Sequence, residues 1–307
     1  MTERQPESCI QEMTVQEFAY AKLNLSLDVT GKREDGYHDM LMVMQTISVS
    51  DRITLERTED PGIRASCNYR YVPTDGRNLA VRAAEAYLQA AGVQQEKKGI
   101  AIRLEKHIPV GAGMAGGSAD AAAVLRGMNR LFGDRLNRQE LEALACSVGS
   151  DVAFCIAGGT ALARGRGELL EDLPALPDCR IVVCKPGFSI STPELFRKLD
   201  EVSLRQHPDT AGMLAALQDG DLRQVGIRMY NVFEDVPDRR MRQINEIKSV
   251  LLDHGALGAV MTGTGSAVFG IYNDHEAAEA CAAVLKKEHR FSHVAEPVEC
   301  ICFKKPG

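Results

Sequence analysis

The sequence lacks an excess of basic residues: 36 Lys and Arg face 42 Asp and Glu, which gives a formal net charge of −6. Proteins with a broad nucleic-acid-binding surface concentrate Lys and Arg to displace counterions from phosphate, so this balance argues against a nucleic-acid partner. A small anionic substrate remains compatible with it, because a few local cations and backbone N–H groups are enough to bind one.

The chain also lacks an uninterrupted hydrophobic run of membrane-spanning length. The uncharged stretch 255–272 contains five glycines and three Thr or Ser, a pattern that favours strand, loop and strand over a spanning helix. The first eight residues, MTERQPES, carry charges and Pro where a signal peptide has an apolar core. We therefore expect no membrane partner, a cytoplasmic protein, and a loose leader over residues 1–14.

Cysteine spacing and composition indicate the redox compartment and the number of domains. None of the nine cysteines forms the C-x-x-C spacing of zinc ribbons or redox pairs, so we expect a reducing compartment and no cysteine-built metal site. With 45% hydrophobic and 25% charged residues, the chain is typical of globular proteins, and its length suggests two domains sharing a cleft. The glycines and prolines of 162–178 favour a boundary near residue 170, which gives domains 1–170 and 171–307.

Residue periodicity predicts the elements that carry the polar motifs. Alternation over 18–29 predicts a strand with one apolar face and one polar face, and Lys22 and Asn24 belong to the polar face. A capping box from Asn137 to Glu140 starts a helix that Gly149 closes, so Asp151 is expected just past a helix end. Helices are also predicted over 78–91 and from 118 to about 133, and strands over 100–104 and 181–184. In the C-terminal part, helices are predicted around 193–230, 238–254 and 275–289.

The most informative segment is 109–123, PVGAGMAGGSADAAA, which lies between a predicted strand and a predicted helix. Its glycines expose backbone N–H groups without side chains in the way, and the following helix directs its positive end at the same place. A polyphosphate is therefore the expected ligand of this loop.

The glycine loop taken alone also allows other interpretations. The contained G-x-G-x-x-G also occurs in dinucleotide-binding turns, but that fold needs an acidic residue at the end of a second strand, and here a helix and a turn at Gly133 follow. The P-loop pattern G-x-x-x-x-G-K-S/T is absent. A packing turn with no ligand also fits the loop taken alone.

Three further segments favour phosphoryl transfer. Lys22 offers a cation for developing charge, Asp151 in the string GSDV offers a carboxylate to accept a hydroxyl proton, and the loop 263–266 adds backbone donors. Ser118 could add a hydroxyl ligand for Mg²⁺. Each segment alone has a simpler reading, since Lys22 fits a surface lysine and Asp151 fits a turn or helix cap.

Taken in order, these segments resemble the GHMP kinases. The glycine loop indicates only the superfamily, whereas DGYH after the KLN strand, GSDV with the later GRGE, and PG-x-S-x-x-TP favour one branch. The acceptor of that branch is a cytidyl diphosphate ester of methylerythritol, and its co-substrate is ATP with Mg²⁺. The resemblance implies an α+β, two-domain GHMP kinase-like fold with the active site in the interdomain cleft. The strings that carry it are AYAKLNLSLDVTGKREDGYHDM, GRNLAVRAA, KHIPVGAGMAGGSADAAAVLRGMN, VGSDVAFCIAGGTALARGRGE, KPGFSISTPELF and GAVMTGTGSAVF.

The resemblance implies a role for each matching residue. Lys22 and Asp151 would be the catalytic pair. For Tyr37 and His38 there is also a direct physical reason, because a pyrimidine base suits an aromatic face and a ring nitrogen that bonds its edge. The acceptor would contact Asn24, Tyr37, His38 and Thr192. The third glycine motif would comprise Gly263, Thr264, Gly265 and Ser266. ATP would contact Asn78, Lys106, Pro109, Val110, Gly111, Ala112, Gly113, Met114, Ala115, Gly116, Gly117, Ser118 and Ala119.

The chain departs from the family pattern at four positions: Tyr20 and Ala153 stand where Pro is usual, Ala115 where Gly is usual, and Ala119 where Ser is usual. A methyl group at Ala115 is unfavourable if its φ is positive. Two alternatives stay open, another GHMP acceptor such as homoserine, mevalonate or a sugar, and a non-catalytic nucleotide-binding protein, which would not need both Lys22 and Asp151. The sequence specifies neither an oligomeric state nor metal ligands.

Overall fold

The computed structural model describes residues 13–93, 99–204 and 206–301. The expected leader 1–14 lies outside these ranges except for its last two residues, and the first strand already begins at Thr14. The first half contains β1 (Thr14–Lys32), β2 (His38–Thr58), β3 (Gly62–Cys67), α1 (Leu79–Ala90), β4 (Gly99–Glu105), α2 (Gly116–Leu131), α3 (Arg138–Val148), α4 (Ser150–Ala157), β5 (Thr160–Gly165) and β6 (Leu169–Asp172). The second half contains β7 (Arg180–Lys185), α5 (Thr192–Leu199), α6 (Thr210–Gln218), α7 (Leu222–Ile227), β8 (Tyr230–Asn231), the 3-10 helix η1 (Val232–Asp235), α8 (Met241–Asp253), β9 (Gly258–Met261), β10 (Val268–Tyr272), α9 (His275–Leu285) and β11 (Phe291–Ala295).

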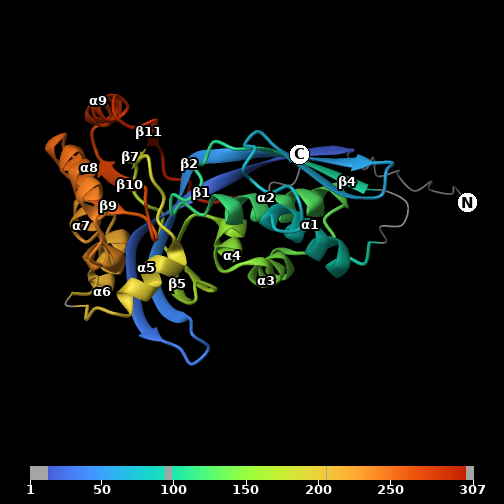
Figure 1. The fold of residues 1–307 in the computed structure, drawn as a ribbon, viewed down its shortest axis with the longest axis horizontal. Helices are drawn as coiled ribbons and strands as arrows, with labels where there is room; N and C mark the ends of the chain where they lie inside the picture. The colour runs from blue at the N-terminus through green and yellow to red at the C-terminus, as the bar shows by residue number, and fades with distance from the viewer. Residues whose placement is uncertain (1–12, 94–98, 205, 302–307) are drawn as a thin grey trace, which may run out of the picture.

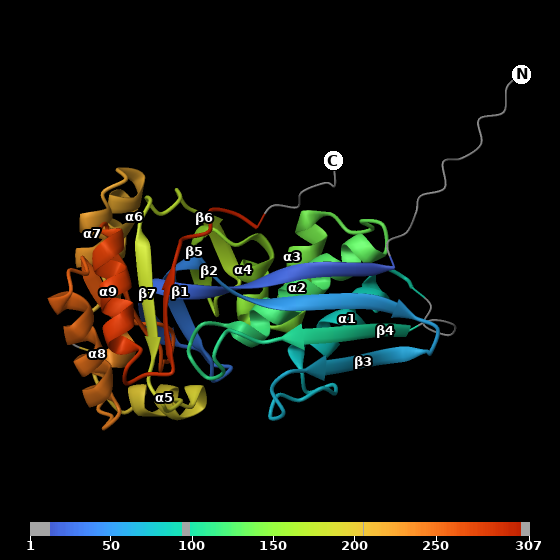
Figure 2. The ribbon, with the colours of Figure 1, turned by 90° about the horizontal axis from the view of Figure 1, so that it is seen from above.

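The six strands of the first half and β8 of the second form a seven-stranded sheet in the order β3-β4-β2-β1-β8, in which β5 pairs with β2 and β6 pairs with β5. Figures 1 and 2 show helices α1–α4 on one face of this sheet. The predicted helix signals are confirmed, since the Asn78 side chain caps α1 and the Asn137–Glu140 capping box starts α3. Helix α2 is alanine-rich and almost wholly buried, so it can lie close against β1.

The polar face expected on β1 is covered. Lys22, Asn24 and Asp28 alternate with apolar residues as the pattern predicts, yet all three are buried. The physical reason is that β8 runs parallel to β1 beside Ser26, and the second half of the chain packs over the face that the sequence alone would expose to solvent. Buried polar groups need hydrogen-bond partners, so the polar side chains of this face are expected to bond other parts of the chain.

The second half forms a four-stranded antiparallel sheet in the order β11-β7-β10-β9, with α8 and α9 packed against it. The chain changes sheets between β6 and β7, and then returns twice: β8 joins β1, and the segment after β11 bonds β2 through Ser48 and Thr46. Figure 1 shows α6–α9 at one end of the molecule and α1–α4 towards the other, and Figure 2 shows β1 and β2 running alongside α1 and α2. Within the described ranges, every helix is too short or too polar to cross a lipid bilayer.

Candidate active site

One cavity of about 1080 Å³ opens where the two halves meet, and both halves line it. Its wall brings together segments that are far apart in the sequence: β1, the glycine loop, the start of α4, the start of α5 and the loop after β9. Four predicted site residues are not part of the wall, namely Asn24, Ala119, Gly265 and Ser266. The predicted site residues that do line it are Lys22, Tyr37, His38, Asn78, Lys106, Pro109, Val110, Gly111, Ala112, Gly113, Met114, Ala115, Gly116, Gly117, Ser118, Asp151, Thr192, Gly263 and Thr264.

The glycine loop ends directly in the N-terminus of α2. No side chain caps this helix, and its first three residues line the cavity. Its first N–H groups and the positive end of its dipole are therefore available to an anion in the cavity. Gly111 and Gly113 have φ values of 64° and 76°, a conformation that side-chain-bearing residues rarely adopt.

Ala115 shares this left-handed conformation, with φ 55° and ψ 29°. The concern raised by the sequence is thus confirmed, because the loop needs a positive φ at the position where this chain has alanine instead of glycine. A left-handed alanine costs roughly 1–2 kcal/mol relative to its ordinary conformations.

Backbone contacts join the glycine loop to β1 and to the loop after β9. The Lys22 N–H donates to the Met114 carbonyl at 3.2 Å, next to a register irregularity in β1 between Tyr20 and Lys22. The Ala267 N–H donates to the Ala112 carbonyl at 3.1 Å. At Gly113 an added Cβ would lie 2.1 Å from the Thr262 carbonyl oxygen, so only glycine allows the two loops to approach this closely.

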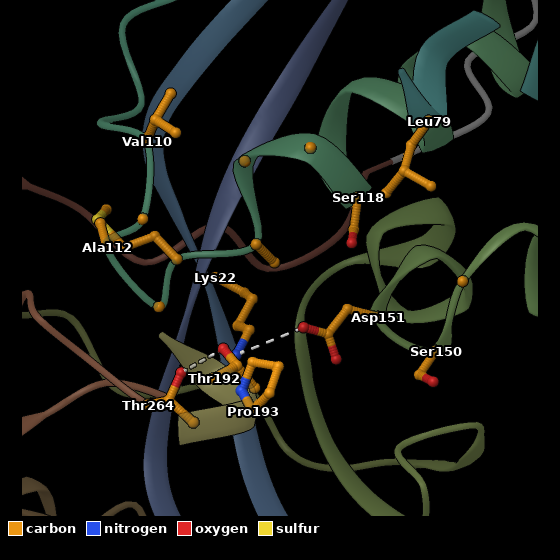
Figure 3. A pocket seen from close by; sticks show the side chains of 18 of the residues that line it. Lys22, Leu79, Val110, Ala112, Ser118, Ser150, Asp151, Thr192, Pro193 and Thr264 are labelled. Atoms are coloured by element: carbon orange, nitrogen blue, oxygen red, sulfur yellow. Dashed lines mark hydrogen bonds and ion pairs between the residues drawn. The ribbon is translucent and has the colours of Figure 1, made fainter. Parts of the chain in front are cut away.

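Lys22 and Asp151 face each other across the floor of the cavity. The Lys22 Nζ lies 3.7 Å from Asp151 Oδ2, and Figure 3 shows both side chains pointing into the space below Ser118. Lys22 is buried, whereas 32% of the Asp151 side chain is exposed to the cavity. Asp151 follows the end of α3 as predicted, but it also lies in the first turn of α4, a helix that the sequence patterns did not predict.

Asn24 orients the Lys22 side chain through a hydrogen bond to its ammonium group. Its Oδ1 accepts a hydrogen bond from Lys22 Nζ at 2.7 Å and another from the Gly263 N–H at 3.1 Å. Its own backbone N–H donates to Thr262 Oγ1 at 3.1 Å. The resemblance implies that Asn24 contacts the acceptor, but in the structure Asn24 is not part of the cavity wall, and its side chain links the Lys22 ammonium group to the third glycine motif.

Lys106 is buried between two carboxylates at the base of the glycine loop. Its ammonium group bonds Asp51 and, at 2.6 Å, Asp120. Burial alone would lower the pKa of Lys106, but the two carboxylates outweigh it and raise that pKa. Burial also raises the pKa of Asp120. Asp51 additionally accepts the N–H groups of His107 and Ile108, so the cluster anchors the segment that leads into the loop.

Aromatic rings gather at the opposite end of the cavity. The His38 ring stacks on Phe196 with centroids 4.8 Å apart, and the Arg166 guanidinium lies 3.9 Å from the centre of the Tyr37 ring. Arg166 and Arg197 both line the cavity, and neither forms an ion pair with another described residue. A cation that forms no direct ion pair beside a cavity suits an anionic ligand.

Sequence reasoning did not single out Phe196, Arg166, Arg197 or Asp200 as site residues. The strings GRGE and PELF contain Arg166 and Phe196, and Arg197 follows PELF directly, so the segments that carry the resemblance pointed to this part of the chain. No string pointed to Asp200. Further apolar wall residues read as ordinary core positions in the sequence, namely Leu27, Met40, Met42, Tyr71, Leu79 and Phe233.

The comparison with known proteins decides the family. The model for the GHMP kinases N terminal domain matches residues 78–159, and the model for the GHMP kinases C terminal domain matches residues 213–290. A 4-diphosphocytidyl-2-C-methyl-D-erythritol kinase of Syntrophomonas wolfei is 46% identical over 276 residues, which cover 90% of this chain and 95% of the relative. The chain belongs to the GHMP kinases.

Two further relatives agree with this family and narrow it. The 4-diphosphocytidyl-2-C-methyl-D-erythritol kinase of Alkaliphilus metalliredigens is 42% identical over 276 residues, covering 90% of this chain and 94% of the relative. A crystal structure of 4-(cytidine 5'-diphospho)-2C-methyl-D-erythritol kinase superposes with a TM-score of 0.77 at 34% identity, over 92% of this chain and 99% of the other. The predicted family, α+β fold and enzyme class are confirmed, and the protein is a small-molecule kinase of a family whose co-substrate is ATP.

Proposed function

We propose that this GHMP kinase transfers the γ-phosphoryl group of ATP to the 2-hydroxyl of 4-diphosphocytidyl-2-C-methyl-D-erythritol, in the cytoplasm, as a step of non-mevalonate isoprenoid precursor synthesis. The observation that carries the proposal is the convergence of Lys22, Asp151 and an uncapped helix N-terminus in one cavity. The names of the relatives support the acceptor.

Asp151 and Lys22 divide the chemistry between them. Asp151 Oδ accepts the proton of the acceptor hydroxyl while the hydroxyl oxygen forms a bond to the γ-phosphorus. The bond from that phosphorus to the β–γ bridging oxygen breaks, and ADP leaves with the electron pair. Lys22 stabilises the negative charge that develops on the transferring group, and Asn24 keeps its ammonium group in place.

The glycine loop and α2 bind the triphosphate through backbone N–H groups. In Figure 3 the Ser118 hydroxyl points into the cavity, where it can act as a ligand of Mg²⁺. Among the described residues no three His, Cys, Asp or Glu side chains gather closely enough to hold a metal ion by themselves. Ser118 would be one ligand of a bound Mg²⁺, and the ion would neutralise part of the phosphate charge.

The far end of the cavity suits the cytidyl diphosphate part of the acceptor. Tyr37, His38 and Phe196 offer aromatic faces to the base. Arg166 and Arg197 supply positive charge for the diphosphate, and this charge has no ion-pair partner within the described part of the chain. Homoserine, mevalonate and simple sugars carry neither the base nor the diphosphate, so they would leave these groups unused.

A panel of acceptor alcohols with ADP release as the measurement tests the proposal. We expect the cytidyl acceptor to be phosphorylated with the highest kcat/KM. In Asp151→Asn and Lys22→Met, kcat should fall by about 10²- to 10⁴-fold while ATP affinity stays within a few-fold of wild type. Asp178→Asn is the matched control, because this carboxylate is 94% exposed and lies outside the cavity.

Two outcomes would contradict the proposal. Near wild-type turnover in both Asp151→Asn and Lys22→Met would show that these two residues are not the catalytic pair. A clear preference for homoserine, mevalonate or a sugar would keep the kinase and overturn the acceptor.

A further inference from the structure

Asp200 lies at the C-terminal end of α5, lines the cavity, and has both carboxylate oxygens occupied. Oδ1 lies 2.7 Å from His38 Nε2, and Oδ2 lies 2.6 Å from Lys32 Nζ. The hydrogen bonds from Lys32 and His38 lower the pKa of Asp200. An ionised carboxylate can only accept hydrogen bonds, so the proton between the two side chains belongs to His38 Nε2.

This contact fixes which ring nitrogen of His38 is available to a ligand. A neutral imidazole carries one N–H, and if Nε2 holds it, Nδ1 is a hydrogen-bond acceptor. The His38 Nδ1 forms no hydrogen bond with any residue that the structure describes. The ring also has little room to turn, because it stacks on Phe196 and only 9% of the side chain is exposed.

Pyrimidine bases differ at the group that such an acceptor would contact. Cytosine carries an exocyclic amino group, which donates, where uracil carries a carbonyl oxygen, which accepts. A ring nitrogen that can only accept therefore favours the first base and leaves the second with two acceptors facing each other. Unpaired polar groups of this kind are costly when solvent is excluded.

We infer that Asp200 is a positioning residue that sets the hydrogen-bonding polarity of the base subsite through His38, and so favours an acceptor whose base carries an amino group. This inference rests on the proposed function, because it assumes that the base lies against His38. It adds a determinant of the choice between cytidyl and uridyl acceptors. Asp200 reaches the base only through His38 and is not itself a catalytic residue.

Kinetic discrimination between two acceptors tests the inference. The acceptors are the cytidyl diphosphate ester and the otherwise identical uridyl ester, and the measured quantity is the ratio of their kcat/KM values. We expect Asp200→Asn to lower this ratio by about 10- to 100-fold, because the amide can either accept from or donate to Nε2 and no longer selects one tautomer. Asp200→Glu keeps an acceptor-only carboxylate and should restore part of the ratio.

A neighbouring carboxylate provides the matched control. Glu201→Gln makes the same change in charge one residue further along, at an exposed side chain outside the cavity, and should leave the ratio unchanged. An equal fall of the ratio in Glu201→Gln, or an unchanged ratio in Asp200→Asn, would overturn the inference. The second result would mean that the base is read through other groups, such as the backbone.

Imidazole ¹⁵N chemical shifts provide a readout that does not depend on activity. We expect the Nε2–H tautomer of His38 in the wild-type protein at neutral pH, and a mixture of tautomers in Asp200→Asn. An Nδ1–H tautomer or a doubly protonated ring in the wild type would overturn the inference. Failure of the proposed function is a separate result: the wild type would then phosphorylate neither ester, and the ¹⁵N spectrum alone would decide the role of Asp200.

Discussion

The cations that line the cavity differ in what they are bonded to. The ammonium group of Lys22 is oriented by a hydrogen bond to Asn24. The charge of Lys106 is neutralised by two carboxylates of the protein. Arg166 and Arg197 have no ion-pair partner among the described residues. At the scale of single residues, the positive charge without a direct ion pair therefore lies at the end of the cavity that we propose for the acceptor, whereas the glycine-loop end, proposed for ATP, offers backbone N–H groups.

Ala115 allows a test of strain in the phosphate loop. Because its φ is 55°, Ala115→Gly should relieve the left-handed strain, while the greater freedom of glycine in the unfolded chain offsets part of the gain. We expect a net increase of about 0.5–1 kcal/mol in the free energy of unfolding, measured by urea denaturation. Ala115→Val should lower it by more than about 1 kcal/mol and raise the KM for ATP. Equal stability of the Gly and Val variants would show that the loop conformation is not strained.

Site residues were predictable from the sequence where they belong to a recognisable local string. Lys22, Asp151 and the glycine loop stand in strings with recognisable spacing. Asp200 was missed because its partner His38 lies 162 positions earlier in the chain, and no local pattern encodes that pairing. The partners of Lys106 were missed for the same reason, since Asp51 is 55 positions away.

At the scale of elements, periodicity predicts which face of an element is polar but not what covers that face. The helix caps at Asn78 and Asn137 were predictable because a cap is decided within four residues. The covered polar face of β1 was not predictable, because β8 and the third glycine motif come from the other half of the chain. Helix α4 was missed because it follows α3 directly and has no side-chain cap to mark its start.

Helix α5 carries Thr192 and Phe196 to the cavity, and a charge cluster holds it in place. Asp238, 2% exposed, accepts hydrogen bonds from Lys198 of α5 and from Arg240, each at 2.6 Å. The bonds from Arg240 and Lys198 lower the pKa of Asp238 below its ordinary range. Its contribution to stability is therefore complete above the unfolded pKa of about 3.9 and is lost as the pH falls through the lower folded value.

Asp238→Asn should reveal this contribution. At pH 7 we expect the free energy of unfolding to fall by about 1–3 kcal/mol, because two charged donors lose their charged acceptor. Below pH 4 the difference from wild type should shrink, since Asp238 of the unfolded wild-type chain then takes up a proton while the folded carboxylate stays ionised. Urea denaturation at a series of pH values measures both effects, and Asp178→Asn, at a carboxylate that is 94% exposed, is the control. A difference in the free energy of unfolding that stays constant down to pH 2 would show that the ionised form of Asp238 is not what stabilises the fold.

At the scale of the whole molecule, two sheets form one active site because their loops touch through bare backbone. The glycine loop of the first half and the 263–266 loop of the second approach so closely that a Cβ on Gly263 would lie 2.9 Å from the Gly113 carbonyl oxygen. Two further contacts hold the halves together. β8 pairs with β1, and the segment after β11 bonds β2. Lys22 and Asp151, the proposed catalytic pair, belong to the first half, yet Asn24 bonds both Lys22 and the second half.

Gly113→Ala tests whether this seam between the halves positions the site. The new methyl group would lie 2.1 Å from the Thr262 carbonyl oxygen at a residue with φ 76°, so the two loops must separate. We expect the free energy of unfolding to fall by about 2–4 kcal/mol and kcat to fall at least about 10-fold, because Thr262 and Gly263 would no longer hold Asn24 and Lys22. Gly187→Ala is the matched control, since its added Cβ meets no atom within 4 Å and its φ is not positive. If Gly113→Ala lost stability but kept the wild-type kcat, the seam would hold the fold together without aligning the catalytic lysine.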